Sequence, residues 1–149
     1  METVGLVACV SLKREQQAAA RDLYISPLFV KARAFVEQRC NRWFILSALH
    51  GLVDPEDVIR PYDLTLNKLN SAERHRWASG IRSQLDVALR PRSRVILLAG
   101  VRYRDGIEDH LALREHDVII PMRGLTIGRQ LSWLSAELRD QLAAPRSPF

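Results

Sequence analysis

The sequence predicts an α/β protein, a layered sandwich with a mainly parallel central sheet of about four strands flanked by helices. Three observations predict this class. Apolar runs typical of strands alternate with segments of helical periodicity along the whole chain. The runs are nearly continuous, as in strands that are covered on both faces. Strands separated by helices also require crossover connections, which are right-handed in parallel sheets.

The first predicted strand is Thr3–Val10, whose sequence TVGLVACV is almost entirely apolar. A polar connection, Ser11–Asp22, follows it. The first helix begins at Ser26–Pro27, because serine is a favourable N-cap and proline suits the first helical position. Apolar residues then recur at helical spacing through Arg39. The second strand is Arg42–Ala48 (RWFILSA).

Residues Leu49–Asn70 are expected to form a long loop, and a segment of this length without regular structure is usually functional. The next helix begins at Ser71 and is stopped by Pro91. The third strand is Ser93–Gly100. The buried stripe of the helix that begins at Ser71 is expected to consist of Trp77, Ile81, Leu85 and Ala88.

The last third of the chain repeats the pattern. A helix is expected over Ile107–Arg114, a fourth strand over Asp117–Met122, and a last helix over Thr126–Ala143. The inner face of the last helix is Leu131, Leu134, Leu138 and Leu142. Residues Ala143–Phe149 are expected to be a frayed, flexible tail. Since no linker divides the chain, residues 1–149 are expected to form a single domain.

The composition is that of an ordinary globular protein, with 47% hydrophobic and 26% charged residues among 149. The longest apolar runs are much shorter than the ~20 residues that span a bilayer, and the N-terminus lacks the basic start of a secretory signal. Cys9 and Cys40 show no metal-type spacing and are interpreted as reduced thiols. We therefore expect a cytoplasmic protein that does not bind a membrane.

The formal net charge is +5, and arginine supplies most of the excess. This charge is compatible with a phosphate-bearing partner, either a nucleotide or a nucleic acid. It is equally compatible with the absence of any such partner.

Three predicted strands run directly into polar residues. In an open parallel sheet, ligands bind outside the carboxyl ends of the strands, so we expect these residues to build one shared, positively charged pocket. The three groups are Cys9, Ser11 and Lys13; Ser47, His50 and Gly51; and Gly100, Arg102 and Tyr103.

After the first strand, Lys13 is a candidate phosphate ligand and a candidate for lowering the pKa of Cys9. The alternatives are a solvated surface charge for Lys13 and a small buried hydrophobe for Cys9. Arg21 can recognise a phosphate bidentately. Tyr24 is either a base-stacking residue or a half-buried tyrosine. Ser26 is expected to cap its helix, where free N–H groups can hold an anion.

After the second strand, His50 can transfer protons near neutral pH. Asp63, beside Tyr62, is a candidate general base or ribose ligand. Ser47 and Tyr62 are further candidates for binding the substrate. The alternative for the whole group is a structured loop held by polar side chains. A serine followed three residues later by histidine is no hydrolase signature, and the sequence holds no G-x-S-x-G elbow.

After the third strand, Gly100 permits a ligand to approach the backbone closely, and Tyr103 can stack on a ring or hydrogen-bond to it. Arg123, Gly124 and Thr126 suggest either a further anion pocket or a plain helix start.

No dinucleotide-binding, Walker, H-E-x-x-H or C-x-x-C motif occurs, so we expect no cofactor and no metal. The remaining histidines, His75, His110 and His116, are interpreted as solvated.

Six sequence motifs together carry a resemblance to a known family. They are C-x-x-x-K (Cys9, Lys13), ARDLYISPLF (Ala20–Phe29), ILSALHGLVDP (Ile45–Pro55), PYD (Pro61–Asp63), LLAG-x-x-Y (Leu97–Tyr103) and GLTIG (Gly124–Gly128). The chain resembles an uncharacterised family of small bacterial, archaeal and phage proteins that carry C-S-x-x-K, L-Y-x-S-x-x-F and I-L-S-A-x-x-G-L motifs. It departs from the first motif at Val10, where Ser11 is the nearest hydroxyl. More distantly, it is similar to the YaaA peroxide-stress proteins and to uracil-DNA-glycosylase-like domains.

The residue types at the strand ends indicate an enzyme that acts on a nucleotide, nucleoside or nucleobase, by hydrolysis or transfer at the N-glycosidic bond. Such a site needs a cation, an aromatic surface and a group that guides water. The candidates are Lys13, Arg21, Tyr24, Tyr103, His50 and Asp63. The alternative, which the YaaA likeness implies, is a non-enzymatic DNA-binding or stress-response protein. A third reading is an interaction module or homodimer anchored by Trp77 or Trp133.

Overall fold

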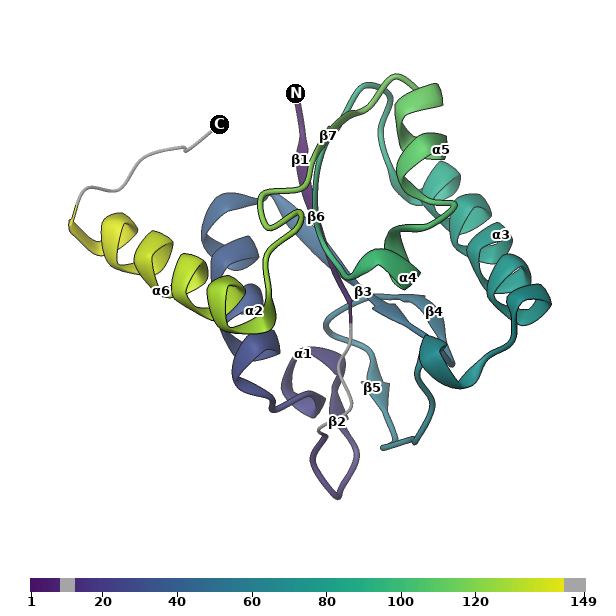
Figure 1. Ribbon diagram of the computed structural model, residues 1–149, viewed down its shortest axis with the longest axis horizontal. Coiled ribbons are helices and arrows are strands. Elements are labelled where there is room, and N and C mark those ends of the chain that lie inside the picture. The colour runs from purple at the N-terminus through teal and green to yellow at the C-terminus, as the bar shows by residue number, and fades with distance from the viewer. Residues whose placement is uncertain (9–12, 144–149) are drawn as a thin grey trace.

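The computed structural model describes residues 1–8 and 13–143 (Figure 1). It confirms the α/β sandwich with a mainly parallel sheet. The central sheet has five strands in the order β4-β3-β1-β6-β7. Four of them are parallel, and β4 is antiparallel to β3. The strands are β1 (Thr3–Ala8), β3 (Arg42–Ser47), β4 (Gly51–Val53), β6 (Arg94–Leu98) and β7 (Asp117–Ile119).

Strand β1 lies at the centre, with Leu6 paired to Phe44 of β3 on one side and to Leu97 of β6 on the other. Since these strands run in the same direction, their carboxyl ends meet at one edge of the sheet. Residues of β1 alternate between two cores, so that Leu6 packs on one face and Val7 on the other.

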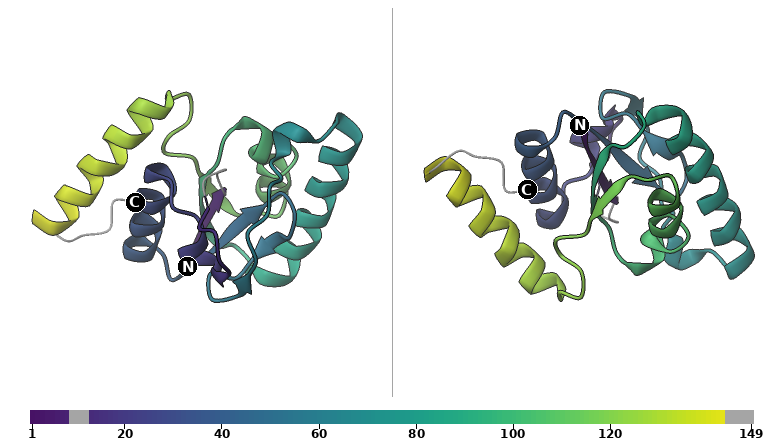
Figure 2. Two further views of the ribbon diagram at one scale, coloured as in Figure 1. Left: turned by 90° about the horizontal axis from the view of Figure 1, so that it is seen from below. Right: turned by 90° about the horizontal axis from the view of Figure 1, so that it is seen from above.

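The two cores are covered by two helical layers (Figure 2). Helices α2 (Pro27–Arg39) and α6 (Ile127–Ala143) belong to the first, and α6 packs on the outside of α2. Helices α3 (Ser71–Ala88) and α5 (Glu108–Leu113) belong to the second. The short helix α4 (Val101–Arg104) follows β6 directly.

Helix α2 begins where the sequence predicts. The Ser26 hydroxyl accepts a hydrogen bond from the Phe29 N–H at 3.2 Å, and Pro27 is the first helical residue. The helix crosses β1 closely at Gly5, where an added Cβ would lie 2.7 Å from the Cγ1 of Val36. Glycine at this position therefore sets the distance between helix and sheet.

Helix α3 begins at Ser71, as predicted, and is held by a capping box between Asn70 and Glu73. Its buried stripe differs in part from the prediction. Ile81 and Leu85 are fully buried, whereas Trp77 and Ala88 are half-buried and Ala78 is buried instead.

The expectation of a long unstructured loop over Leu49–Asn70 is wrong. Gly51 adopts a φ of +74°, so the chain turns back directly after β3 and pairs with it as β4. Further on, β5 (Val58–Ile59) pairs with β2 (Ala18–Ala19), and a 3₁₀ helix, η1, spans Leu66–Lys68. The predicted polar connection before the first helix accordingly contains β2 and a short helix, α1 (Ala20–Leu23).

Several predicted strands and helices are longer than the observed ones. The third and fourth strands end at Leu98 and Ile119, and the last helix begins at Ile127. The first strand is described through Ala8, and Val10 lies outside the described residues. None of the described helices combines the length and apolar character that crossing a bilayer requires.

Two histidines are not solvated as expected. The Nε2 of His110 lies 2.8 Å from a carboxylate oxygen of Asp86. The Nδ1 of His116 accepts a hydrogen bond from the Ser93 N–H at 3.0 Å. The His110 imidazole thus joins α5 to α3, and the His116 imidazole joins the residue before β7 to the residue before β6. His75 is exposed.

Candidate functional site

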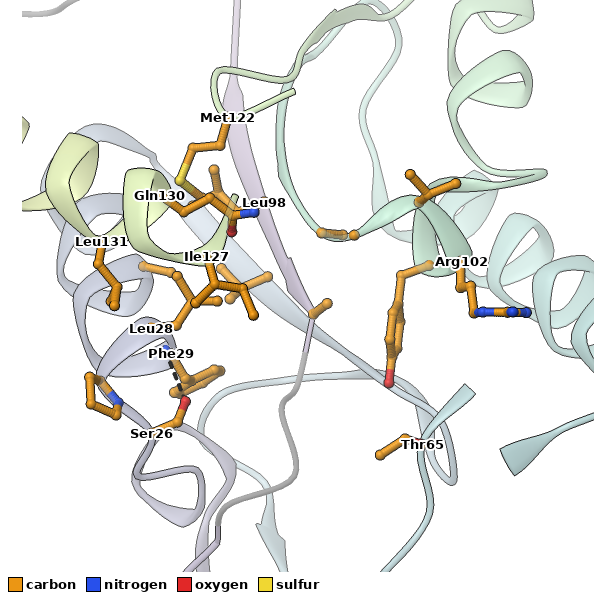
Figure 3. Close-up of a pocket in the computed structure, with 18 of the residues that line it drawn as sticks. Ser26, Leu28, Phe29, Thr65, Leu98, Arg102, Met122, Ile127, Gln130 and Leu131 are labelled. Atoms are coloured by element: carbon orange, nitrogen blue, oxygen red, sulfur yellow. Dashed lines mark hydrogen bonds between the residues drawn. The ribbon is translucent and has the colours of Figure 1, made fainter. Parts of the chain in front are cut away.

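A cavity of about 670 Å³ opens at the carboxyl ends of β1 and β6 (Figure 3). Its walls come from the start of α2, from α4, from the segment around η1 and from the first turns of α6. The volume falls in the range of about 300–1,000 Å³ that is typical of small-molecule sites. The position is the one expected for a ligand site in a parallel sheet.

The lining is mostly apolar. Val7, Phe29, Leu98 and Met122 form its buried floor. The polar contributors are Ser26, Thr65, Asn67, Arg102, Tyr103 and Gln130. Among the described lining residues, Arg102 is the one charged side chain, and there is no carboxylate or imidazole. An apolar cavity with a few polar groups suits a ligand that combines a ring with a polar or anionic part.

The two sides of the cavity differ. Figure 3 shows Leu28 and Ile127 on the side of α2 and α6, and Arg102 on the opposite side with its guanidinium directed away from them. Ile127 is 66% exposed, so an apolar side chain stands at the mouth. The charged group therefore lies at the rim, while the interior is apolar.

Gly100 leaves room at the end of β6. An added Cβ at this position would meet nothing within 4 Å, and the φ of −70° is accessible to any residue. The absence of a side chain therefore contributes open space to the cavity, not conformational freedom.

Beside the cavity lies a group of polar side chains that we call the tyrosine cluster, formed by Lys13, Tyr24, Ser47, His50 and Tyr62. The Tyr24 and Tyr62 hydroxyl oxygens lie 2.5 Å apart, and the Tyr62 hydroxyl lies 2.7 Å from the Oγ of Ser47. That Oγ also accepts a hydrogen bond from the His50 N–H at 3.0 Å. Tyr24 is 1% exposed and Ser47 is fully buried, so the cluster holds three distant segments together.

Two further groups pack on the Tyr62 ring. The Lys13 ammonium lies 4.4 Å from the ring centroid, at a distance where the cation is attracted to the aromatic face. The His50 ring meets the Tyr62 ring edge to face, with centroids 5.3 Å apart. Lys13 also pairs with Tyr24 through an isolated antiparallel bridge, which places the ammonium over this part of the fold.

A chain of contacts joins the tyrosine cluster to the cavity. The indole N–H of Trp77 donates to the backbone carbonyl of Ser47 at 2.8 Å. The Trp77 ring meets the Tyr103 ring edge to face at 5.5 Å, and Tyr103 lines the cavity. Lys13, His50 and Tyr103 are thus connected along one rim of the sheet.

The candidate residues divide into two sets. Ser26, Gly100 and Tyr103 line the cavity. The candidates in the tyrosine cluster, together with Arg21 and Asp63, are not among its described lining residues. Cys9 lies outside the described residues, directly after the lining residue Ala8 in the chain.

Arg21 and Asp63 both form ion pairs with other side chains. Arg21 forms ion pairs with Asp22 and Glu56. The Asp63 side chain is 90% exposed, and its carboxylate lies 2.9 Å from the Lys68 ammonium. The hydrogen bond and charge of Lys68, with a contribution from Lys13, hold the pKa of Asp63 below its ordinary value. Asp63 is therefore ionised at neutral pH.

The candidate anion pocket before the last helix has a different environment from the one expected. Arg123 pairs with Glu108, which neutralises its charge. The Thr126 Oγ1 accepts a hydrogen bond from the Arg129 N–H at 3.4 Å, as a helix N-cap does. The described part of the chain contains no cluster of three or more His, Cys, Asp or Glu side chains arranged for a metal ion.

The sequence reasoning missed the walls that come from η1 and α6. Leu131 has the spacing of a core residue of its helix, and the structure places it half-buried at the cavity. Gln130 lies beside it, where its amide donates to the Leu125 carbonyl at 2.9 Å. No sequence signal distinguishes a helix face that lines a cavity from one that packs in a core.

The model of one protein family matches residues 4–136 of the chain, and that family is described as a family of unknown function (DUF6884). No curated protein matches the chain. No solved structure matches it either. The expectation of an uncharacterised family is thus confirmed, whereas the motif patterns and the likeness to YaaA and uracil-DNA-glycosylase-like domains stay predictions.

Proposed function

Because the chain belongs to the DUF6884 family, whose function is unknown, we propose a function from the site itself: the protein binds a nucleotide, nucleoside or nucleobase in the cavity and acts on it as an enzyme. One observation carries the proposal. An apolar cavity at the carboxyl ends of parallel strands has an arginine at its rim that forms no ion pair among the described residues.

The base would occupy the interior. Phe29, Leu98 and Met122 offer an apolar surface, and Gly100 leaves space next to the backbone of β6. Tyr103 supplies an aromatic ring and a hydroxyl, the two features that commonly recognise a base. A planar ring with a few polar edges is complementary to a cavity of this character.

The sugar and phosphate would point to the rim. Arg102 is exposed there, and a guanidinium binds phosphate through paired N–H groups. The start of α2 borders the cavity as well, and helix N-termini favour anions.

The reaction that we propose is hydrolysis or transfer at the N-glycosidic bond. In hydrolysis, water adds to the anomeric carbon while the carbon–nitrogen bond breaks and the base leaves with a proton. Since the described lining holds no carboxylate or imidazole, the group that guides water would come from beside the cavity. His50 and Asp63 are the candidates, and Cys9 follows the lining residue Ala8 in the chain.

The test is a panel of nucleotides, nucleosides and free bases, with binding followed by calorimetry and base release by chromatography. Gly100→Leu places a side chain in the open space of the cavity and should abolish binding. Gly80→Leu is the matched control, because an added Cβ there also meets nothing within 4 Å and Gly80 lies on α3, away from the lining.

Binding that Gly100→Leu leaves intact would overturn the proposal for the cavity. Base release that survives both His50→Ala and Asp63→Ala would remove these two residues from the mechanism. Binding without any turnover would favour the non-enzymatic alternative, a DNA-binding or stress-response protein.

A further inference from the structure

A second feature of the cavity is the side-chain amide of Gln130, which lies on the wall formed by α6. Its Nε2 donates a hydrogen bond to the Leu125 carbonyl at 2.9 Å, and its backbone N–H donates to the Thr126 carbonyl at 2.8 Å. Gln130 is thus held by hydrogen bonds from both its backbone and its side chain, which fixes the direction of the amide.

The hydrogen bond to Leu125 also decides which amide atom faces the cavity. A carbonyl oxygen only accepts hydrogen bonds, so the amide atom next to the Leu125 carbonyl must be the nitrogen. Leu125 is not among the described lining residues, whereas Gln130 is. Figure 3 shows the Gln130 oxygen on the side of the amide that faces Ile127 and the interior of the cavity.

This oxygen is an acceptor that the protein does not use. Among the described residues, no group donates a hydrogen bond to the Oε1 of Gln130. Leu98 and Met122, which line the same cavity, are apolar and buried and have no donor to offer. A ligand that fills the cavity displaces water from this oxygen, so the ligand must supply a donor or leave the acceptor unpaired.

Three other polar side chains of the lining differ from Gln130 in this respect. The Ser26 Oγ already accepts a hydrogen bond from the Phe29 N–H. Thr65 and Asn67 line the cavity from the segment around η1, and Asn67 is exposed. Neither side chain has a hydrogen bond to a described residue that would fix its direction. The acceptor of Gln130 is therefore better suited to select one ligand over another.

Gln130 and Arg102 lie on opposite sides of the cavity (Figure 3). In the proposed function the phosphate binds at Arg102, so the edge of the base that is furthest from the sugar extends toward Gln130. In the common bases this is the edge used for base pairing. It carries an N–H donor in each of them, either an amino group or a ring N–H, and enzymes that take up a single base commonly read this edge.

From this arrangement we infer that Gln130 selects the ligand, because its Oε1 accepts a hydrogen bond from an N–H on the pairing edge of the base. The inference rests on the proposed function and names its substrate class. That class consists of bases that carry an amino or ring N–H on this edge and are not paired, since pairing would occupy the same N–H.

The test measures by calorimetry the affinities of matched pairs of nucleoside monophosphates that differ at this N–H. Adenosine is paired with purine riboside, and cytidine with pyrimidinone riboside. Uridine and guanosine are paired with derivatives whose N–H groups on this edge are all methylated. For the base that the protein binds, the member with the N–H should bind about 10- to 100-fold more tightly, because the analogue leaves the Gln130 oxygen unpaired.

Gln130→Met removes the acceptor at nearly constant side-chain length. It should make the two affinities of the pair equal, because neither ligand then leaves an acceptor unpaired. Gln130→Glu keeps an oxygen acceptor but loses the donor to Leu125, and it should retain the preference for the N–H. Gln38→Met, at an exposed position of α2 outside the described lining, is the matched control and should change neither affinity.

The inference and the proposed function fail differently. If both members of a pair bind equally well to the parent protein, the inference is wrong and the proposed function stands. The same holds if Gln130→Met weakens both members alike, because Gln130 then only holds the segment at Leu125. A preference that persists in Gln130→Met, or that is lost in Gln130→Glu, also overturns the inference. If no member of any pair binds, the proposed function fails and the inference with it.

Discussion

The Tyr62 hydroxyl lies 2.7 Å from the Oγ of Ser47, and this contact fixes the segment after β5 to the end of β3. Ser47 is fully buried, and its Oγ is also the acceptor for the His50 N–H. One hydroxyl thus organises the turn after β3 and positions the aromatic ring on which Lys13 lies. The tyrosine cluster thus connects segments of the fold and lies beside the cavity.

Ser47→Ala should destabilise the protein by about 1–3 kcal/mol, because the His50 N–H and the part-buried Tyr62 hydroxyl each lose a hydrogen-bond partner. Urea denaturation measures the free energy of unfolding. Ser79→Ala, at an exposed position of α3, is the control and should stay within about 0.5 kcal/mol of the parent. Equal effects of the two substitutions would show that the Ser47 hydroxyl contributes nothing.

Two glycines should respond with opposite signs to the same substitution. Gly5→Ala should cost about 1–3 kcal/mol, because the new methyl group would lie 2.7 Å from Val36 and force α2 away from β1. Gly80→Ala should stabilise by up to about 1 kcal/mol, since Gly80 lies in an exposed helical position with open space around it. Thermal unfolding of the pair checks both, and a tolerated Gly5→Ala would contradict the close crossing.

Glu2 should make stability depend on pH. The hydrogen bond from Arg42, with the charges of Arg42 and Arg90, holds the pKa of Glu2 below its ordinary value of 4.5 despite the opposing effect of burial. A lowered carboxyl pKa stabilises the fold above the ordinary value, and that contribution is lost as the pH falls through the folded-state pKa.

Glu2→Gln should therefore cost about 1 kcal/mol at pH 7, and the difference from the parent should shrink below pH 4.5. Urea denaturation across this pH range is the measurement. Glu15→Gln, at an exposed site with no ion pair among the described residues, is the control. A difference that stays constant with pH would contradict the role of the Glu2 charge.

The Cys40 thiol is half-buried and should react slowly in the folded protein. Burial raises the pKa of its thiol to about 12, against the opposing charge of Arg39, so the reactive thiolate is almost absent at neutral pH. Iodoacetamide at pH 8 should label Cys40 far more slowly in the native protein than in urea, as read by mass spectrometry of the Cys40 peptide. Equal rates in the two states would contradict the burial.

Local chemistry made much of the fold predictable. The Ser26–Pro27 start of α2 and the start of α3 at Ser71 follow from capping preferences, and the structure confirms both. Strand β4 was not predicted, because three residues are too few to show the alternation of apolar and polar residues that identifies a strand. Its pairing depends on the reversal at Gly51, which brings it back onto β3.

The sequence indicated the edge of the sheet at which the cavity opens, but it did not indicate all of the residues that line the cavity. The expectation that ligands bind outside the carboxyl ends of parallel strands points to the edge of the sheet where contacts join Lys13, Tyr62 and Tyr103. That these residues bind a ligand stays a prediction. The wall supplied by α6 depends on how this helix docks on α2. Contacts between residues about one hundred positions apart fix that docking, such as the one from Lys31 to Ser135 at 2.7 Å. Periodicity within one helix carries no information about such contacts.

The five-stranded sheet ends on both sides in a strand of three residues, β4 on one side and β7 on the other. A strand from a neighbouring molecule would find only a brief row of main-chain donors and acceptors at either border. Short borders of this kind protect against edge-to-edge stacking and fibril growth. The protein should accordingly withstand concentration and crowding without polymerising through its sheet.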